Sequence, residues 1–350
     1  AGLTDVAGST SAAEADLNKG AEGSLPEQTV TVDQIKTSAT PEPTATSAPT
    51  EPPADSAAGE TTTEPTAAPA EGPQPDNSGT GETINVTMNG TAQTMDLVQC
   101  LAMVAQNELG PNAPAEAYKA QCVATHCWII SQSGYPSVLG AEPGAAALAA
   151  AQEVAHVLVT YNGQVCFTPY FASASTGTAS AAEVWGNDRA WRQAVDSPYD
   201  QSVSSHWNTN GNSSGTARFS RQTLQDRIRD VMDIDLSGVD PNSWFTIQSA
   251  NQYGWVAKIQ VGPDASVGTV SGRWFRENLL ARQSVDGRSL RSQCFTVSYN
   301  ADLDCFIFDV YGYGHGCGMS QWGAIGYARN GWGYQDILTH YFVGTTITTY

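Results

Sequence analysis

The first 82 residues contain no phenylalanine, tryptophan, tyrosine or cysteine. They hold ten of the 18 prolines, and their 14 acidic residues against two lysines give −12 of the formal net charge of −19. A segment with so few large apolar side chains cannot offset the entropy lost on folding by burying apolar surface. The composition therefore predicts that residues 1–82 form a disordered, extended linker. It would be either a stalk between a surface domain and its anchor or a tail without a specific role.

A membrane-length apolar run and a leader segment are also missing. No charge-free apolar stretch reaches about 18 residues, which argues against a transmembrane helix. The chain starts at Ala1, and no basic-then-apolar signal segment precedes it. We interpret the chain as the processed form of an exported precursor, with membrane contact expected only through a missing N-terminal anchor.

Residues 83–350 lack a basic patch and carry a net charge of −7, so we expect no nucleic-acid partner. They also lack a CxxC pair, so the strong zinc-ribbon signal is absent. All seven cysteines lie in this part, and the odd count leaves at least one outside any intramolecular disulfide. Disulfides and buried free thiols both remain open. The cysteines are Cys100, Cys122, Cys127, Cys166, Cys294, Cys305 and Cys317.

The residues after the linker begin with recognisable local signals. Residues 83–95 alternate apolar and polar side chains around an Asn-Gly pair, which predicts a β-hairpin. Asp96 is the predicted N-cap of a helix over residues 97–109, and a Gly-Pro pair ends that helix. A second helix is expected to start near Pro114, a favoured first-turn position for proline, and to continue to Ile130.

Further along, helices and strands are interspersed without a regular βαβ alternation, and no internal repeat is visible. We therefore predict an α+β fold, with a β-rich centre and flanking helices that form a substrate groove, for one domain over residues 83–350. Expected helices cover 145–156, 220–232, 322–329 and 334–342, and expected strands cover 157–161, 164–171, 256–261, 294–299 and 305–311.

Glu108 stands at the end of the first predicted helix, beside the Gly-Pro break. Partial burial at the lip of a cleft would raise the pKa of its carboxyl and let it donate a proton at neutral pH. Cleavage of a glycosidic bond needs such an acid to protonate the leaving oxygen. The alternative is an ordinary solvated carboxylate at a helix end.

On the next predicted helix, Lys119, Cys122 and His126 have the spacing of one helix face. A cation and an imidazole on one stripe can bind a polar sugar or steady a carboxylate. Cys122 and His126 also have the spacing of metal ligands, although no further ligands are evident. The alternative is a partly exposed helix face without a ligand.

Residues 312–323 concentrate five glycines around one histidine, one serine and one glutamine. The segment is not GxGxxG and no βαβ unit surrounds it, which argues against a dinucleotide site. It is not GxSxG either, because Trp322 takes the last glycine position, so a hydrolase nucleophile elbow is excluded. Cys317 lies two residues from His315, but a cysteine-peptidase pair usually meets through the fold rather than along the chain.

Several of these segments together resemble the SpoIID/LytB family, named for stage II sporulation protein D and an amidase enhancer. The most specific match is Gly-His-Gly-Cys-Gly-Met-Ser-Gln-Trp-Gly-Ala at 314–324, and it continues with Gly-Tyr-Gln-Asp-Ile-Leu-Thr-His-Tyr-Phe-Val-Gly-Thr at 333–345. Lys-Ala-Gln at 119–121 and Glu-Val-Trp-Gly at 183–186 match as well. The resemblance covers roughly residues 83–350.

The resemblance implies a lytic transglycosylase that cleaves peptide-stripped glycan strands of peptidoglycan, in sporulation or cell-wall remodelling. The family's catalytic glutamate falls on Glu108, which would protonate the leaving oxygen and then act as base while a 1,6-anhydro ring closes. A second carboxylate is not obligatory, though Glu183 and Asp196 are candidates, and no cofactor is required. The alternative is a non-catalytic peptidoglycan-binding protein that enhances a wall amidase. Both place the protein outside the cell or in the envelope of a bacterium.

The same resemblance implies a set of substrate-binding residues, in which Lys119 would line the groove. Four positions depart from the family pattern: His126 replaces an arginine, Ala172 a histidine, Thr176 a glycine and Cys317 a small aliphatic residue. Some members hold zinc near Ala172, and without that histidine we predict no metal. A cysteine peptidase that uses Cys317 is a third reading. The predicted substrate-binding residues are Lys119, Gln121, His126, Ser173, Ser175, Glu183, Trp185, His315, Ser320 and Gln321.

Overall fold

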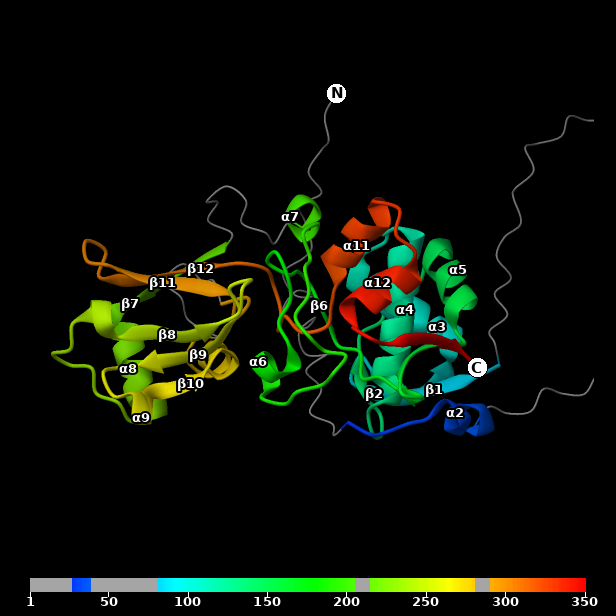
Figure 1. Cartoon of the computed structure of the whole chain (residues 1–350), viewed down its shortest axis with the longest axis horizontal. Helices are drawn as coiled ribbons and strands as arrows, with labels where there is room; N and C mark the ends of the chain where they lie inside the picture. Colours follow the sequence, from blue (N-terminus) through cyan, green and yellow to red (C-terminus); the bar gives the residue numbers. More distant parts are fainter. Residues whose placement is uncertain (1–26, 39–80, 205–214, 281–289) are drawn as a thin grey trace, which may run out of the picture.

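The computed structural model has both helices and several small sheets, so the predicted α+β class is confirmed. Figure 1 shows a mainly helical lobe, a β-rich lobe and a connecting region between them. Every helix among the described residues is too short or too polar to cross a lipid bilayer. The structure describes residues 27–38, 81–204, 215–280 and 290–350.

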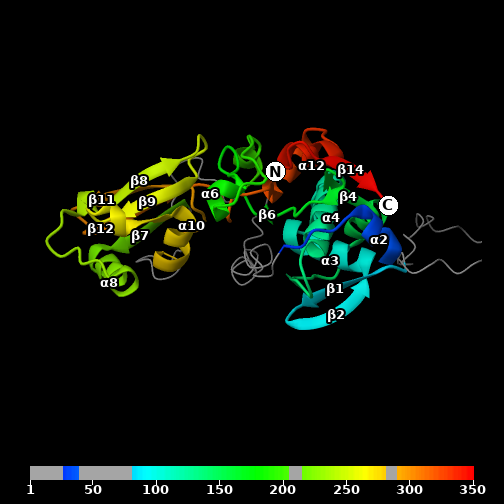
Figure 2. The same ribbon diagram turned by 60° about the horizontal axis from the view of Figure 1, so that its bottom comes forward.

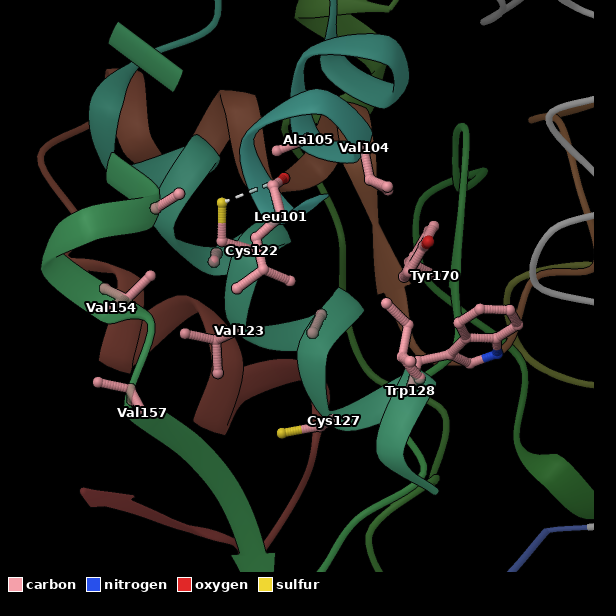
Figure 3. Close-up of a cluster of buried hydrophobic side chains, with 14 of the residues drawn as sticks. Leu101, Val104, Ala105, Cys122, Val123, Cys127, Trp128, Val154, Val157 and Tyr170 are labelled. Carbon is pink, nitrogen blue, oxygen red and sulfur yellow. Dashed lines mark hydrogen bonds between the residues drawn. The ribbon is translucent and has the colours of Figure 1, made fainter. Parts of the chain in front are cut away.

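The helical lobe is built around α4 (Ala115–Ile130), which contacts four other helices. Twelve of its residues are buried, so α4 has no strongly polar face, as expected of a helix surrounded by others. Figure 3 shows part of this core, in which Leu101, Trp128 and Tyr170 are buried. The surrounding helices are α3 (Leu97–Leu109), α5 (Ala145–Val154), α11 (Gln321–Arg329) and α12 (Tyr334–Tyr341).

The predicted hairpin is confirmed as β1 (Thr83–Met88) and β2 (Thr91–Asp96), which pair antiparallel. Asn89 and Gly90 both have positive φ, as a tight two-residue turn requires. The predicted N-cap is confirmed too, since the Asp96 carboxylate accepts a hydrogen bond from the Gln99 amide at 3.0 Å. A short strand, β3 (Ser137–Val138), lies parallel to β1.

A second sheet of this lobe has the strand order β14-β4-β5, which puts the C-terminal strand beside the middle of the chain. The predicted strand 157–161 is confirmed as β4, but the predicted strand 164–171 is divided in two. Pro169 lies at the division, where its missing N–H interrupts a ladder. These strands are β4 (Val157–Tyr161), β5 (Gln164–Val165), β6 (Tyr170–Phe171) and β14 (Thr346–Thr349).

The β-rich lobe contains two three-stranded sheets, ordered β10-β9-β8 and β11-β12-β7. An aromatic core joins them, with Trp244 stacked on Phe306 at a centroid distance of 5.2 Å. The β-rich part is thus a lobe at one end rather than a centre flanked by helices (Figure 1). Its elements are β7 (Thr216–Ser220), α8 (Arg221–Met232), β8 (Phe245–Ala250), β9 (Val256–Val261), α9 (Ala265–Gly268), β10 (Thr269–Ser271), α10 (Gly272–Trp274), β11 (Phe295–Asn300) and β12 (Cys305–Val310).

The connecting region pairs β6 with β13 (Met319–Ser320) in parallel and carries the short helices α6 (Ala181–Trp185) and α7 (Asp200–Val203). Trp255 of the β-rich lobe is fully buried against this region and donates its indole N–H to the Gly177 carbonyl at 2.8 Å. The Gly316 backbone approaches the same indole so closely that a Cβ would lie 2.3 Å from it. The two lobes are therefore joined by close packing and not only by the chain.

Residues 27–38 correct the expectation that the whole of 1–82 is disordered. They include α2 (Val32–Ser38), and they lie along the helical lobe (Figure 2). The Val165 amide donates to the Val30 carbonyl at 2.8 Å, and Val32 and Ile35 pack against the helical core. The average composition of the linker hid a short alternating stretch, Thr-Val-Thr-Val at 29–32, that has the pattern of a strand edge. Residues 1–26 and 39–80 lie outside the described residues.

All seven cysteines are buried free thiols, which decides between the two states that the sequence left open. Burial raises the pKa of Cys317 to about 12, so this thiol stays protonated at neutral pH. Cys122 lies in the helical core with its sulfur 3.7 Å from the Leu101 carbonyl (Figure 3). These thiols therefore behave as apolar packing groups.

Candidate functional site

Glu108 and Gln321 meet from positions 213 residues apart in the sequence. Glu108 lies in the last turn of α3, and Gln321 is the first residue of α11. The Gln321 side-chain amide donates to Glu108 Oε2 at 2.6 Å. Glu108 keeps part of its surface accessible, whereas Gln321 is buried. The contact leaves Oε1, the other carboxyl oxygen, as the place for a proton.

Burial raises the pKa of the Glu108 carboxyl to about 7, against the opposing effect of the hydrogen bond from Gln321. A carboxyl with this pKa is protonated in about half of the molecules at neutral pH. Partial exposure lets the same group reach a molecule outside the core. Glu108 thus combines the two properties that a general acid needs.

Two buried polar atoms of the helical lobe have no hydrogen-bond partner among the described residues. They are Asn107 Nδ2, in the residue next to Glu108, and Gln121 Oε1 on α4. The Gln121 amide nitrogen donates to Thr125 Oγ1 at 3.1 Å, and Thr125 hydrogen-bonds the buried Tyr170 hydroxyl. Buried polar atoms rarely stay unpaired in a native protein, so we expect each to hydrogen-bond an ordered water.

Asp200 is a second buried carboxyl, and the sequence assigned it no role. Its side chain accepts hydrogen bonds from the Ala174 amide at 2.7 Å and from Ser173 Oγ at 3.2 Å. The hydroxyls of Ser197 and Ser320 donate to it as well, each at 2.5 Å. Burial raises its pKa to about 6, although each of these hydrogen bonds lowers it.

Ser173 and Ser320 were predicted to bind substrate, and both are fully buried around Asp200 instead of being exposed. Ser320 is also the N-cap of α11, since its hydroxyl accepts from the Gly323 amide at 3.1 Å. Ser320 therefore fixes the start of α11, where Gln321 follows. The Asp200 cluster positions the helix that presents Gln321 to Glu108.

His315 is buried and hydrogen-bonded through both ring nitrogens. Its Nδ1 accepts from the Cys317 amide at 3.2 Å, so Nε2 carries the proton and donates to the Tyr170 carbonyl at 3.1 Å. Burial, with a contribution from Arg276, lowers the pKa of His315 to about 3. The ring is therefore neutral and fixes β6, and it does not act as a base for the Cys317 thiol.

Glu183, Ser175 and Trp185 face the junction with the β-rich lobe. Glu183 forms a capping box with Ser180 at the start of α6 and accepts from Asn251 at 3.0 Å. Ser175 Oγ donates to the Tyr253 carbonyl at 2.9 Å. A pocket of about 590 Å³ between α6 and the β-rich lobe is lined by Glu183 and Trp185 on one side.

Lys119 and His126 are at different places on α4. The Lys119 ammonium, near the start of the helix, forms ion pairs with Glu116 at 2.8 Å and Glu153 at 2.6 Å. His126 lies near the other end, buried beside Tyr350, and burial lowers the pKa of its imidazole to about 4. The structure therefore does not bring His126 to Glu108.

The two candidate second carboxylates have other contacts. Asp196 is exposed and accepts from the Tyr253 hydroxyl at 2.8 Å, and Glu183 is held in its capping box. Within the described ranges, no group of three or more His, Cys, Asp or Glu side chains has an arrangement that could hold a metal ion. Among the residues that the structure describes, Glu108 is thus the one carboxyl that combines partial accessibility with a pKa near 7.

Curated relatives align with the chain at low identity. An Amidase enhancer of Bacillus subtilis (strain 168) is 24% identical over 285 residues, which are 71% of this chain and 40% of that protein. A Stage II sporulation protein D of the same strain is 23% identical over 191 residues, 55% of this chain and 48% of that protein. The Stage II sporulation protein D of Bacillus amyloliquefaciens is 24% identical over 191 residues, 55% of this chain and 47% of that protein.

These names are the ones after which the SpoIID/LytB family is called, so the resemblance predicted from the sequence is confirmed. No family model matches the chain. The chain spans less than half the length of each of these relatives.

Proposed function

From this resemblance to the SpoIID/LytB family, we propose that the chain acts on the bacterial cell wall and cleaves peptide-stripped glycan strands as a lytic transglycosylase. Its place of action is then the cell envelope or the exterior of a bacterium. The observation that carries the proposal is the Glu108 carboxyl, which is partly accessible and has its pKa raised to about 7 by burial.

In the proposed reaction, the Glu108 carboxyl donates its proton to the oxygen that links N-acetylmuramic acid to the next sugar. The bond from the anomeric carbon to that oxygen breaks, and the electron pair leaves with the oxygen. The Glu108 carboxylate then accepts the proton of the muramyl 6-hydroxyl, whose oxygen bonds to the anomeric carbon and closes a 1,6-anhydro ring. The proton returns to Glu108, so one carboxyl suffices and no water is consumed.

Gln321 has a positioning role in this proposal. Its amide donates to Oε2 of Glu108 at 2.6 Å, which orients the carboxyl and leaves Oε1 to carry the transferred proton. The same hydrogen bond stabilises the carboxylate formed after proton donation.

The alternative function is a peptidoglycan-binding protein that enhances a wall amidase without cleaving glycan itself. One relative is named Amidase enhancer, and it aligns with 71% of this chain. Several residues predicted to bind substrate also have internal roles, such as Ser320 as a helix cap. In this case Glu108 is a buried structural carboxyl and the amidase is the partner.

Digestion of peptide-stripped glycan strands by the wild-type chain and by Glu108→Gln tests the proposal, with the products identified by mass spectrometry. We expect products ending in 1,6-anhydro-muramic acid from the wild type and a loss of about 10²- to 10⁴-fold for the variant. Gln321→Glu would be a poor control because it touches Glu108, so Glu142→Gln, at an exposed glutamate, serves as the matched change.

Intact strands with the wild-type chain, together with retention of the chain on glycan, would exclude the enzyme and favour the amidase enhancer. Stimulation of a purified wall amidase by wild type and Glu108→Gln alike would then support that second function. Equal turnover by wild type and Glu108→Gln would exclude Glu108 as the acid.

A further inference from the structure

Arg192 is a buried cation in an aromatic frame. Its side chain is 2% exposed, and its guanidinium carbon lies 4.9 Å from the ring centroid of Phe167. The centroids of Trp185 and Trp191 are 5.5 Å and 5.8 Å away. Aromatic faces attract the flat face of a guanidinium. The N–H donors at the edge of the guanidinium then remain available to an anion.

The one ion-pair partner of Arg192 among the described residues comes from the N-terminal segment. Glu27 Oε2 accepts from Arg192 Nη2 at 3.2 Å, and the Glu27 side chain is 31% exposed. The Arg192 Nε atom is buried and has no hydrogen-bond partner within the described ranges. An arginine fork can bind both oxygens of a carboxylate. Glu27 accepts from Nη2 and leaves the Nε donor unused.

The segment that carries Glu27, residues 27–38, is here called the strap. Its backbone joins the domain at two places, where the Gln28 amide donates to Ser131 and the Val165 amide donates to Val30. The sequence places 42 residues, 39–80, between the strap and the next described residue. The strap is thus distant in the sequence from the domain on which it lies, and it is held there by these backbone bonds, by the Gln28 side chain and by the packing of Val32 and Ile35.

A competing ligand must replace the Glu27 carboxylate beside Arg192. Burial tends to lower the pKa of Arg192, and Glu27 tends to raise it. An arginine keeps its charge under these conditions, and a buried charge without a partner is strongly destabilising. Arg192 therefore needs an anion in this position, and the anion found there is a carboxylate.

We propose that Arg192 and its aromatic frame form a binding site for the carboxylate of an acidic sugar, and that Glu27 of the strap occupies this site in competition with that ligand. The sugar assignment rests on the proposed function. Peptide-stripped glycan strands carry a free lactyl carboxylate on each N-acetylmuramic acid, and a carboxylate is the group that the arginine fork can bind through both oxygens.

Calorimetric titration of the full chain with N-acetylmuramic acid tests this site without any cleavage. We expect Glu27→Ala to bind N-acetylmuramic acid about tenfold more tightly than the wild type, as for a strap that is docked in about nine of ten molecules. N-acetylglucosamine, which lacks the lactyl carboxylate, should show no gain. Glu142→Ala removes an exposed carboxylate elsewhere and should bind as the wild type does.

Adding Arg192→Gln to Glu27→Ala should abolish the gain, and Arg192→Lys should restore only part of it because an ammonium lacks the planar fork. A cooperative thermal transition above the titration temperature shows that each variant is folded, and Glu27→Ala should lower its midpoint because Arg192 loses its anion. No gain for Glu27→Ala, or a gain that persists in Arg192→Gln, would overturn the proposal. Tighter binding of acetate without tighter binding of N-acetylmuramic acid would overturn the sugar assignment. Failure of glycan cleavage leaves these binding results unaffected, so the two proposals fail separately.

Discussion

Two carboxyls of the helical lobe and the connecting region share a raised pKa but differ in their surroundings. Glu108 has one donor, Gln321, and keeps part of its surface accessible. Asp200 has four donors and is fully buried. Burial is the largest influence on both, and it raises their pKa to about 7 and about 6.

The difference separates a reactive group from a structural one. The Asp200 carboxylate accepts four hydrogen bonds and is fully buried, so a substrate cannot reach it, and removing it takes an acceptor from four donors. A carboxyl with one donor and an open side can exchange a proton with an outside molecule. A raised pKa alone therefore does not identify an acid, and the count of donors together with accessibility does.

The largest effect on stability is expected for Asp200→Ala. The Ala174 amide and three hydroxyls lose their acceptor, and buried donors without partners cost about 1–3 kcal/mol each, partly recovered by hydroxyl rotation. We expect a loss of about 3 kcal/mol in the free energy of unfolding, measured by urea denaturation at pH 7. Asp302→Ala, at an exposed turn, should stay within about 0.5 kcal/mol. An equally small change for Asp200→Ala would remove the structural role given to this cluster.

The packing against Asp200 can be tested at Gly323. A Cβ at this position would lie 1.9 Å from the Tyr341 hydroxyl, 2.5 Å from Ser197 Oγ and 2.7 Å from Asp200 Oδ2. Gly323→Ala should therefore destabilise the chain by about 2 kcal/mol despite the better helix propensity of alanine. Gly333→Ala, where the nearest atom is 3.4 Å away, is the matched control. A stabilised Gly323→Ala would show that the cluster has room to relax.

The stability of Glu108→Gln at two pH values tests whether the pKa of Glu108 is raised in the folded protein. The pKa of Glu108 is raised in the folded protein from an ordinary value near 4.5 to about 7. Its contribution to stability is thus complete below about pH 4.5 and is lost as the pH rises through 7. Relative to the wild type, Glu108→Gln should gain about 1 kcal/mol between pH 5 and pH 6, measured by thermal unfolding at both values. A difference that does not grow with pH would contradict the raised pKa.

Local signals of the sequence predicted much of the fold. The Asn89-Gly90 turn, the Asp96 cap and the helix that ends at Leu109 depend on neighbouring residues only, and all three are present. The position of Glu108 at a helix end followed from the same signals. The division of the predicted strand 164–171 followed from Pro169, a local feature to which the alternation pattern gave too little weight.

The partners of the site could not be predicted, because they come from distant parts of the chain. Gln321 reaches Glu108 across 213 positions, and Ser320 reaches Asp200 across 120. Such contacts depend on how α11 packs, which no local pattern specifies. The strap was missed for another reason, since the composition was averaged over 82 residues and the short Thr-Val-Thr-Val alternation was lost in it.

The smallest expected effect concerns the hydrogen bond from Gln321. This bond lowers the pKa of Glu108, while burial raises it to about 7. Because the acid form of Glu108 donates the proton, glycan cleavage by the wild type should fall about tenfold per pH unit above pH 7. Gln321→Ala removes the lowering effect, so the falling limb should move to higher pH, by less than about one unit or ~1.4 kcal/mol. The pH dependence of kcat/KM on peptide-stripped strands measures this shift. A falling limb that moves to lower pH would mean that Gln321 stabilises the protonated form of Glu108. The hydrogen bond from Gln321 would then raise the pKa of Glu108, which contradicts the role given to it here.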